Sequence, residues 1–491
     1  MAIKRFYAKK DNTISNAFKE DLTTRATGSN MGASDILEVF SIYGQASTSS
    51  SELARALIEF NTEDISSART AGSIPASGSV DFYLRLYDAE HVESTPRDFT
   101  LTVAAVSQSW TEGTGLDMNN YTDLGASNWE KCNSVTFWTA SGGNFLTSSD
   151  YPNMSRTQEF DGTEDLNMEV TSIVEEWLID NDKPNFGFGV FLESALEGAS
   201  ESYYTKKFFS RTSEFFHKRP IIEARWNDSI ADDSSNFYLS SSRAPQADNL
   251  NTIFLYNYIR GQLVNIPDVD GGAIYVSLYS GSSGPQDGPL FLPNSDPAAV
   301  DGDTKALGGH VETGIYSASV AFSSSSITTV YPVWHNGGDP EVVYYSGSGI
   351  TVKSLDGANN YPIKDFVTNI TNLKTVYSTD EVARFRLYVR PKNWNPNLYT
   401  VAQTQIETTP IEKAYYKLER VVDNFEVISY GTGSGNGSYT QLSYDVSGNY
   451  FDLDMSMLQS GYSYQLSFLF NLVGEYSEQR AKFKFRVSDG D

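Results

Sequence analysis

The residues best suited to metal binding or nucleophilic chemistry are few and scattered in this sequence. The four histidines lie far apart, and none forms an HxH, HExxH or Cys/His pair: His91, His217, His310 and His335. Transition-metal sites commonly use such short spacings, so the sequence predicts no site of this kind. The single cysteine, Cys132, has no histidine near it in the chain, and no cysteine–histidine catalytic pair is predicted.

Two acidic, glycine-containing segments, 268–272 and 301–303, carry carboxylates that would suit calcium. Neither completes an EF-hand loop, because the third acid and the terminal glutamate are absent. In a chain with 62 acidic residues, clusters of this kind are expected by chance. We therefore expect no cofactor, with bound calcium as the less favoured alternative.

Two pairs of carboxylates are candidates for a glycosidase pair, and the spacing of the strand pair is compatible with hydrolytic chemistry. Glu175 and Glu176 fall on a predicted helix, and Asp452 and Asp454 fall on one face of a predicted strand, about 6 to 7 Å apart. The glycine-rich segment 431–437 lacks the GxSxG, GxGxxG and Walker lysine patterns, so a hairpin loop is the better interpretation. Because a solvated acidic surface also accounts for the pairs, the sequence predicts a protein that is not an enzyme.

Two other features suggest binding rather than catalysis. Trp394 lies in the loop-like segment 393–397, where its ring would stack on a sugar or fill an interface, with core packing as the equal alternative. Three arginines alternate along one predicted strand and form a candidate docking stripe for an acidic neighbour: Arg384, Arg386 and Arg390.

Antiparallel strands are expected to position all of these residues. Apolar and polar residues alternate in runs separated by Gly, Ser, Asn and Asp, most clearly at 80–86, 274–278, 383–390 and 462–470. This period of two is typical of strands with one face in a core. The predicted fold class is all-β, a series of antiparallel β-sandwich modules of the jelly-roll or immunoglobulin-like kind.

One short helix is predicted, in the first module. Ser172 and Glu175 have the spacing of a capping box, and Ile173, Val174 and Trp177 share one side of the following turns. We expect this helix to plug one end of the sandwich.

Length and composition bound the organisation of the chain. The 491 residues suit two to four domains. A polar run at 227–235 and a softer break near 357 predict three modules, at 1–226, 227–356 and 357–491. The net charge of −26 argues against nucleic acid or an anionic membrane as a partner, and no apolar stretch approaches the length of a membrane span.

The compartment follows from the first residues and the cysteine count. One cysteine excludes an intramolecular disulfide, and the segment after Met1 has charges but no apolar signal region. The composition, rich in Tyr and Phe, nevertheless suits an exterior setting. We expect a protein made in a host cytoplasm without a signal peptide and released either by leaderless secretion or as part of a virion.

Residues 1–226 resemble a DNRLRE-type domain, a β-sandwich module similar to some carbohydrate-binding modules. The motifs that carry the resemblance occur in order along the chain: 30–39, 55–60, 109–115 with its Trp-x-Glu-Gly turn, 127–129, Trp138, 142–143, 170–178, 184–189, 208–211 and 219–224. The family offers no catalytic motif, so the resemblance implies a fold but no binding site.

The chain as a whole resembles structural proteins of large tailed phages that infect marine cyanobacteria, with 444–462 similar to their final module. This resemblance implies a non-enzymatic component of the virion, an appendage or decoration docked on tail, neck or head. Its partners would be other virion proteins, in a homo-oligomer or multi-copy assembly. The alternative is a glycan-binding adsorption module that recognises a host-surface polysaccharide.

Overall fold

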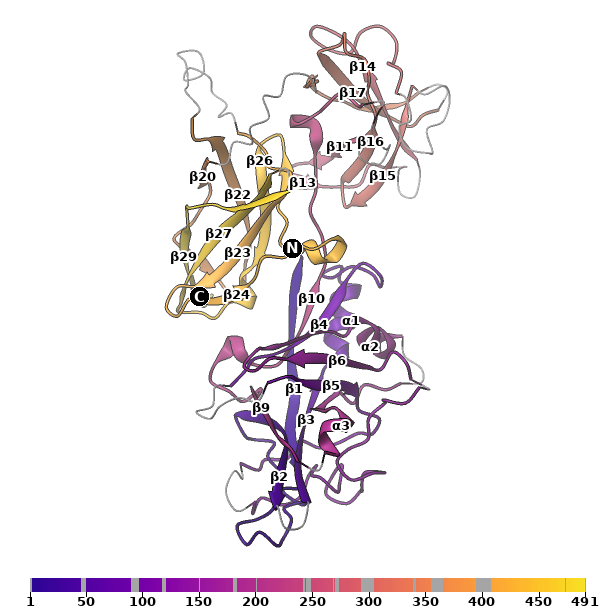
Figure 1. The fold of residues 1–491 in the computed structure, drawn as a ribbon. Helices are drawn as coiled ribbons and strands as arrows, with labels where there is room; N and C mark the ends of the chain where they lie inside the picture. The colour runs from indigo at the N-terminus through magenta and orange to yellow at the C-terminus, as the bar shows by residue number, and fades with distance from the viewer. Residues whose placement is uncertain are drawn as a thin grey trace.

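The computed structural model shows an all-β chain of β-sandwich modules, as the alternation of apolar residues predicts (Figure 1). The structure describes the following residues: 2–45, 50–89, 97–116, 121–149, 151–179, 183–199, 201–241, 243, 249–267, 269, 273–292, 304–338, 341–354, 365–393, 408–472 and 474–490. Each large sheet is built from one continuous part of the chain, which we call modules 1, 2 and 3 in chain order.

Module 1 is a sandwich organised around one long strand. Strand β1 pairs with β10 through Ile3–Tyr7 and with β3 through Ala8–Ser15, with a register shift between Ala8 and Lys10. It therefore belongs to both layers of the sandwich. The strands are β1 (Ile3–Ser15), β2 (Ile36–Gln45), β3 (Ser50–Phe60), β4 (Asp81–Leu86), β5 (Phe99–Ala105), β6 (Ser155–Phe160), β7 (Leu166–Glu169), β8 (Phe188–Leu192), β9 (Tyr203–Phe209) and β10 (Ile221–Arg225).

The described residues of module 1 also form three α-helices where the sequence predicted one: α1 (Thr62–Thr70), α2 (Thr171–Leu178) and α3 (Ser194–Glu197). Helix α1 buries only Ile65 and Ala68, so it has no apolar stripe that would reveal it in the sequence. Helix α2 forms where it was predicted, but the capping box is wrong. Its N-cap is Val170, which makes no side-chain cap, and the Ser172 hydroxyl donates instead to the Asn153 carbonyl.

Helix α2 has the predicted role of a plug. It buries Ile173, Val174 and Trp177, and the Trp177 ring lies 4.7 Å from the ring of Phe188 on β8. The ring is 7% exposed. The helix thus closes the apolar core between the two layers.

Module 2 has a sheet and an apolar core of its own. The sheet runs β11-β16-β15-β14-β17-β18, with β19 paired to β17, and buries the side chains of Tyr316 and Trp334. The strands of the module are β11 (Asn251–Tyr256), β12 (Tyr258–Ile259), β13 (Gln262–Leu263), β14 (Ile274–Tyr279), β15 (Ala306–Glu312), β16 (Ile315–Val320), β17 (Thr329–His335), β18 (Val343–Ser346) and β19 (Ile350–Thr351).

Module 3 is a two-sheet sandwich. One sheet runs β20-β22-β26-β25 and the other β21-β29-β27-β23-β24, with β28 added beside β27. Between them, the Phe385 ring packs 5.2 Å from that of Phe451 and 5.8 Å from that of Phe485. The strands are β20 (Phe366–Ile370), β21 (Val376–Ser378), β22 (Val382–Pro391), β23 (Ala414–Arg420), β24 (Phe425–Ile428), β25 (Ser443–Asp445), β26 (Gly448–Asp454), β27 (Ser463–Leu472), β28 (Glu475–Glu478) and β29 (Phe483–Ser488).

The polar run after module 1 binds to module 3 rather than forming a free linker. Ala231 bridges Tyr444 in parallel, the amide of Asp232 donates to the Tyr444 carbonyl at 3.0 Å, and the Tyr444 amide donates to Ile230 at 2.9 Å. Module 2 then begins at Phe237, whose carbonyl accepts from the amide of Lys353 at the module's end. Module 2 is therefore inserted between two segments that both belong to module 3.

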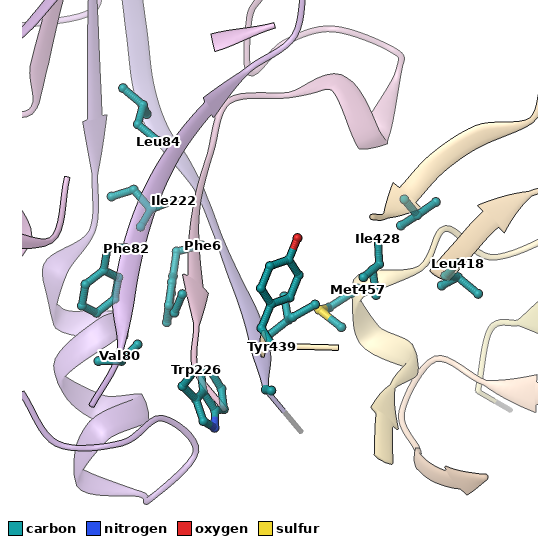
Figure 2. Packing of buried hydrophobic residues seen from close by; sticks show 14 of the residues in the cluster. Phe6, Val80, Phe82, Leu84, Ile222, Trp226, Leu418, Ile428, Tyr439 and Met457 are labelled. Atoms are coloured by element: carbon teal, nitrogen blue, oxygen red, sulfur yellow. The ribbon is translucent and has the colours of Figure 1, made fainter. Parts of the chain in front are cut away.

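Modules 1 and 3 share one continuous apolar cluster, whereas module 2 has a separate one. Figure 2 shows Phe6 and Trp226 of module 1 on one side, Ile428 and Met457 of module 3 on the other, and Tyr439 between them. We call this contact the joint. It makes one body of two modules that lie at opposite ends of the chain.

Candidate functional site

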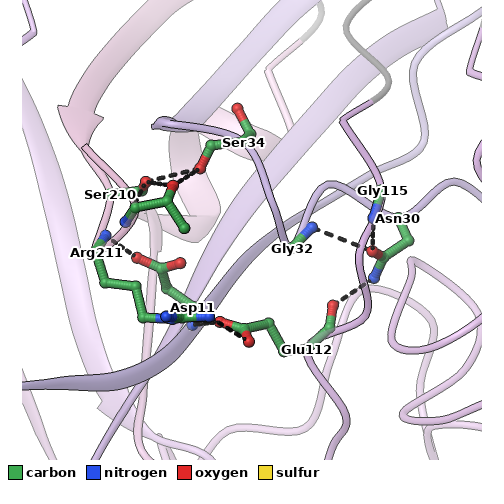
Figure 3. Close-up of polar contacts among 9 residues, drawn as sticks. Asp11, Asn30, Gly32, Ser34, Glu112, Gly115, Ser210 and Arg211 are labelled. Atoms are coloured by element: carbon green, nitrogen blue, oxygen red, sulfur yellow. Dashed lines mark hydrogen bonds and ion pairs between the residues drawn. The ribbon is translucent and has the colours of Figure 1, made fainter. Parts of the chain in front are cut away.

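A network of polar side chains fixes the loops of module 1 (Figure 3). Arg211, after β9, donates from Nε and Nη2 to the two carboxylate oxygens of Glu112, both at 2.7 Å. The Arg211 amide donates to Asp11 Oδ2 at 2.6 Å, and the Asp11 amide donates to Glu112 Oε1 at 2.8 Å. The network ties β1, the Trp-x-Glu-Gly turn and the loop after β9 together.

Asn30 extends this network through close backbone approaches. Its Nδ2 donates to the Glu112 carbonyl at 2.6 Å, and its Oδ1 accepts from the amides of Gly32 and Gly115. Gly113 adopts φ +81°, and a Cβ there would lie 2.3 Å from Asn30 Oδ1. Only glycine fits this position without displacing the asparagine, so the motif residues serve the packing of the loops.

Asp11 has an unusual pKa in this setting. Burial is the main cause, and together with the nearby Glu112 charge it outweighs the Arg211 amide and guanidinium, which raises the pKa of Asp11 to about 7. A carboxyl with a raised pKa beside a second carboxylate is an arrangement used in acid–base catalysis. Here Glu112 is engaged by Arg211 on both oxygens, so we interpret the pair as a structural element.

The tryptophans of module 1 pack inside it and do not form a binding platform. A small apolar cluster joins Trp110, Trp129 and Trp138 to the buried Cys132. The Trp110 indole donates to the Phe186 carbonyl at 2.8 Å, and the Trp138 indole donates to Asn128 at 2.8 Å.

The joint contains a buried group of four charged side chains. Glu223 on β10 pairs with three arginines: Arg5 Nε at 2.8 Å, Arg85 Nη1 at 3.3 Å and Arg225 Nη2 at 2.8 Å. Although burial acts to raise it, the pKa of Glu223 is lowered by these arginines. The spacing along the chain gives no sign of this cluster, which the sequence analysis missed.

Several contacts cross the joint from this cluster to module 3. Arg5 donates from Nη2 to the Val427 carbonyl, and the Arg225 guanidinium lies 4.9 Å from the Tyr439 ring centroid. His217 Nε2 lies 3.2 Å from the Tyr464 hydroxyl. Burial, with the charges of Arg5 and Arg420, lowers the pKa of His217 to about 3.

The candidate docking stripe is engaged within the chain. Arg384 Nε and Nη2 each lie 2.8 Å from an oxygen of Asp452, its register partner on β26, and Arg386 pairs with Asp445 at 3.0 Å. Arg390 Nη1 donates to the Pro391 carbonyl at 3.3 Å. An acidic neighbour would therefore have to compete with these carboxylates. Trp394 and the calcium candidates at 268, 270–272 and 301–303 lie outside the described residues.

The carboxylate pairs considered for hydrolysis are likewise engaged. Glu175 pairs with Arg69 of α1 at 2.6 Å and Glu176 pairs with Lys183 at 3.0 Å. Asp454 accepts from the Ser456 amide at 2.9 Å. The glycine-rich segment 431–437 lies against module 1, where Asn436 Nδ2 is 3.2 Å from Asp81.

Module 2 aligns a serine, a histidine and a glutamate, which the sequence analysis also missed. Ser277 Oγ lies 3.0 Å from His335 Nε2, and His335 Nδ1 lies 2.5 Å from Glu341. The order is that of a hydrolase triad. However, the Gly337 amide also lies 3.1 Å from Nδ1, so Glu341 shares that nitrogen with a backbone group. With Ser277 3% exposed, we interpret the three as a structural link between strands.

A cavity of about 240 Å³ lies where the three modules meet. Module 3 lines it with the rings of Tyr416, Tyr439 and Tyr450. Its charged groups are Asp228 in the polar run after module 1, Glu312 of module 2, and the Arg384–Asp452 pair. Carboxylates thus outnumber guanidinium groups three to one, which disfavours an anionic ligand.

Within the described residues, no group of three or more His, Cys, Asp or Glu side chains is arranged to hold a metal ion. Among the same residues, no helix is both long and apolar enough to cross a membrane.

Comparison with known proteins places the chain in no family. No protein-family profile matches it, and no curated protein does. The solved structures that align with it include two distant likenesses. A trypsin-activated alpha-2-macroglobulin from Escherichia coli aligns at 10% identity and TM-score 0.16, over 88% of this chain and 24% of that one. A DUF4785 family protein from Legionella pneumophila aligns at 7% identity and TM-score 0.13, over 99% and 90%. Scores this low carry no argument about function.

Proposed function

We propose that this protein is a non-enzymatic structural component of a tailed-phage virion, a modular appendage or decoration docked on tail, neck or head. The proposal combines the resemblance of the sequence with one structural observation, the joint. A particle component must hold a fixed spacing between its neighbours. The shared core and the Glu223 cluster couple modules 1 and 3 in a fixed arrangement, while module 2 offers a separate surface.

Antibody labelling of intact particles from the source lysate, read by electron microscopy, tests this function. Discrete label on tail, neck or head is the expected result. Label absent from particles, with the protein soluble in the lysate, would overturn it.

Docking through the arginine stripe is a separate part of the proposal. Arg384→Glu combined with Arg386→Glu should reduce incorporation into particles, because the reversal repels an acidic neighbour. Lys392→Glu, which alters an exposed pair with Asp365, serves as the matched control. Unchanged incorporation of the double variant, once its folding is verified by circular dichroism, would rule the stripe out.

The alternative function is recognition of a host-surface glycan, and the cavity between the modules favours it. Tyrosine rings beside carboxylates, the Gln441 amide and the Ser443 hydroxyl are the groups that bind sugars. Binding on a glycan array that is lost in Glu312→Gln would support this cavity as the glycan-binding site. Binding that is lost in Trp394→Ala would instead favour segment 393–397 as the site. No binding to any host lipopolysaccharide would count against both.

A further inference from the structure

The joint buries more positive than negative charge. Arg5 and Arg85 both pair with the same carboxylate, Glu223, which also pairs with Arg225. Arg225 has further partners in the Asn167 side-chain oxygen at 3.1 Å and the Tyr83 ring at 4.0 Å. One carboxylate thus serves three guanidinium groups, so positive charge remains beside Arg5 and Arg85. Burying such charge is costly unless an anion compensates it.

Buried polar groups at the joint also lack hydrogen-bond partners among the described residues. In the described part of the chain, Arg85 Nε, the Tyr87 hydroxyl and His217 Nδ1 are buried without a hydrogen-bond partner. The Arg85 guanidinium lies 5.1 Å from the Tyr87 ring centroid. The rings of Tyr87 and His217 each lie 5.8 Å from that of Phe425 in module 3. Such orphaned groups cost about 1 to 3 kcal/mol each, and native proteins rarely leave several together.

We propose that Arg5, Arg85 and Tyr87 bind a small monovalent inorganic anion, such as chloride, inside the joint. Guanidinium groups only donate hydrogen bonds and the tyrosine hydroxyl can donate one, so their common ligand is an acceptor. The excess positive charge requires it to be negative, and the burial of Tyr87, 3% exposed, restricts it to a few atoms.

The other charges that reach Tyr87 leave this conclusion unchanged. Besides the two arginines, the charges that act on it are those of Glu223 and Asp165. Glu223 is shared among three arginines, and Asp165 accepts from the Asp88 amide at 2.7 Å. Because the Tyr87 ring packs on Phe425 of module 3, the anion site is covered from solvent only when the modules are docked. Anion binding therefore favours the docked state by mass action.

Thermal unfolding of the full-length protein in different salts tests the site. At fixed ionic strength, replacing gluconate by chloride or bromide should raise the melting temperature, with saturation as the halide concentration increases. Tyr87→Phe removes only the hydroxyl. It should weaken the apparent halide affinity about tenfold, which is the effect expected from the loss of roughly one hydrogen bond to a charged group. Tyr83→Phe, on the same face of β4 as Arg85, keeps its ring beside Arg225 and should leave the halide effect intact.

Crystals soaked in bromide give the direct readout. An anomalous peak within hydrogen-bonding distance of Arg85 Nε and Tyr87 Oη is the expected result. Melting temperatures that do not depend on the anion, a Tyr87→Phe variant with the wild-type halide response, or bromide confined to the surface would each overturn the proposal. None of these results bears on where the protein lies in a particle.

Discussion

Asp11 offers a quantitative test of the polar network in module 1. Its folded pKa is about 7 against an ordinary value of 3.8, a rise of about 3 units. Each unit corresponds to about 1.36 kcal/mol. Because the folded pKa is raised, the stabilising contribution is fully present below about pH 4 and is lost as pH rises through 7. The loss over this window is on the order of 4 kcal/mol.

Asp11→Asn should abolish this loss. The asparagine oxygen can still accept from the Arg211 amide, but it never carries the charge that Glu112 repels. Relative to the wild type, the variant should gain about 3 kcal/mol between pH 5 and pH 8, because over about two of those units Asp11 is protonated in the folded state and ionised in the unfolded state. For a domain the size of module 1, that gain is about 6 to 12 °C in melting temperature.

The assay is differential scanning fluorimetry of both proteins at half-unit pH steps. Subtracting the wild-type curve from the variant curve removes the titration of all other groups. Asp489→Asn, in an exposed segment near the end of the chain, controls for the loss of one negative charge. Parallel curves for Asp11→Asn and the wild type would refute the reasoning, since they would mean that Asp11 is ionised across the whole range.

Three further predictions concern the core and the joint. Trp177→Ala should cost about 3 to 5 kcal/mol of unfolding free energy, because it leaves a cavity beneath helix α2. Trp177→Phe keeps a ring at this position and should cost less than about 1.5 kcal/mol. Chemical denaturation measures both variants, and equal losses would show that the volume of the ring does not determine the stability. Glu223→Gln should lower the free energy of unfolding by about 3 to 5 kcal/mol, because it leaves buried arginines without a carboxylate. The control is Glu176→Gln, at the partly exposed pair with Lys183, which should lower it by less than about 1 kcal/mol. Similar urea midpoints for the two variants would contradict the buried cluster. His217 has a folded pKa of about 3, below its ordinary 6.5, so its contribution is present above pH 6.5 and lost as pH falls toward 3. Acidification to pH 5 should therefore cost the wild type about 2 kcal/mol that His217→Gln does not lose, and an equal acid response in both proteins would disprove the assignment.

The sequence predicts well those features that depend on neighbouring residues. The alternation at 383–390 places β22 (Val382–Pro391) within a residue or two, and the apolar positions Ile173, Val174 and Trp177 locate α2. Helix α1 is missed because only Ile65 and Ala68 are buried and its length is mostly polar. Composition also marks 227–235 as the boundary between two modules, but backbone hydrogen bonds, which composition does not encode, attach part of it to Tyr444 of the third module.

The other features that the sequence did not predict depend on contacts between distant parts of the chain. Arg5, Arg85 and Glu223 stand apart in the sequence as ordinary charged residues, and only the pairing of β1, β10 and β4 brings them together. Ser277 and His335 are likewise aligned by the pairing of β14 with β17. Neither constellation has a local spacing that a motif search would detect.

The joint has a consequence for how the chain folds during synthesis. Arg5 and Val427, which it connects, are 422 positions apart. At about 5 to 20 residues per second, a ribosome that has completed β10 needs roughly 10 to 40 s more to reach β24. During that interval, module 1 exposes the face around Phe6, Trp226 and the arginine cluster to solvent. Rapid translation or a chaperone that covers this face should therefore increase the yield of folded protein, and pausing between modules 1 and 3 should promote aggregation.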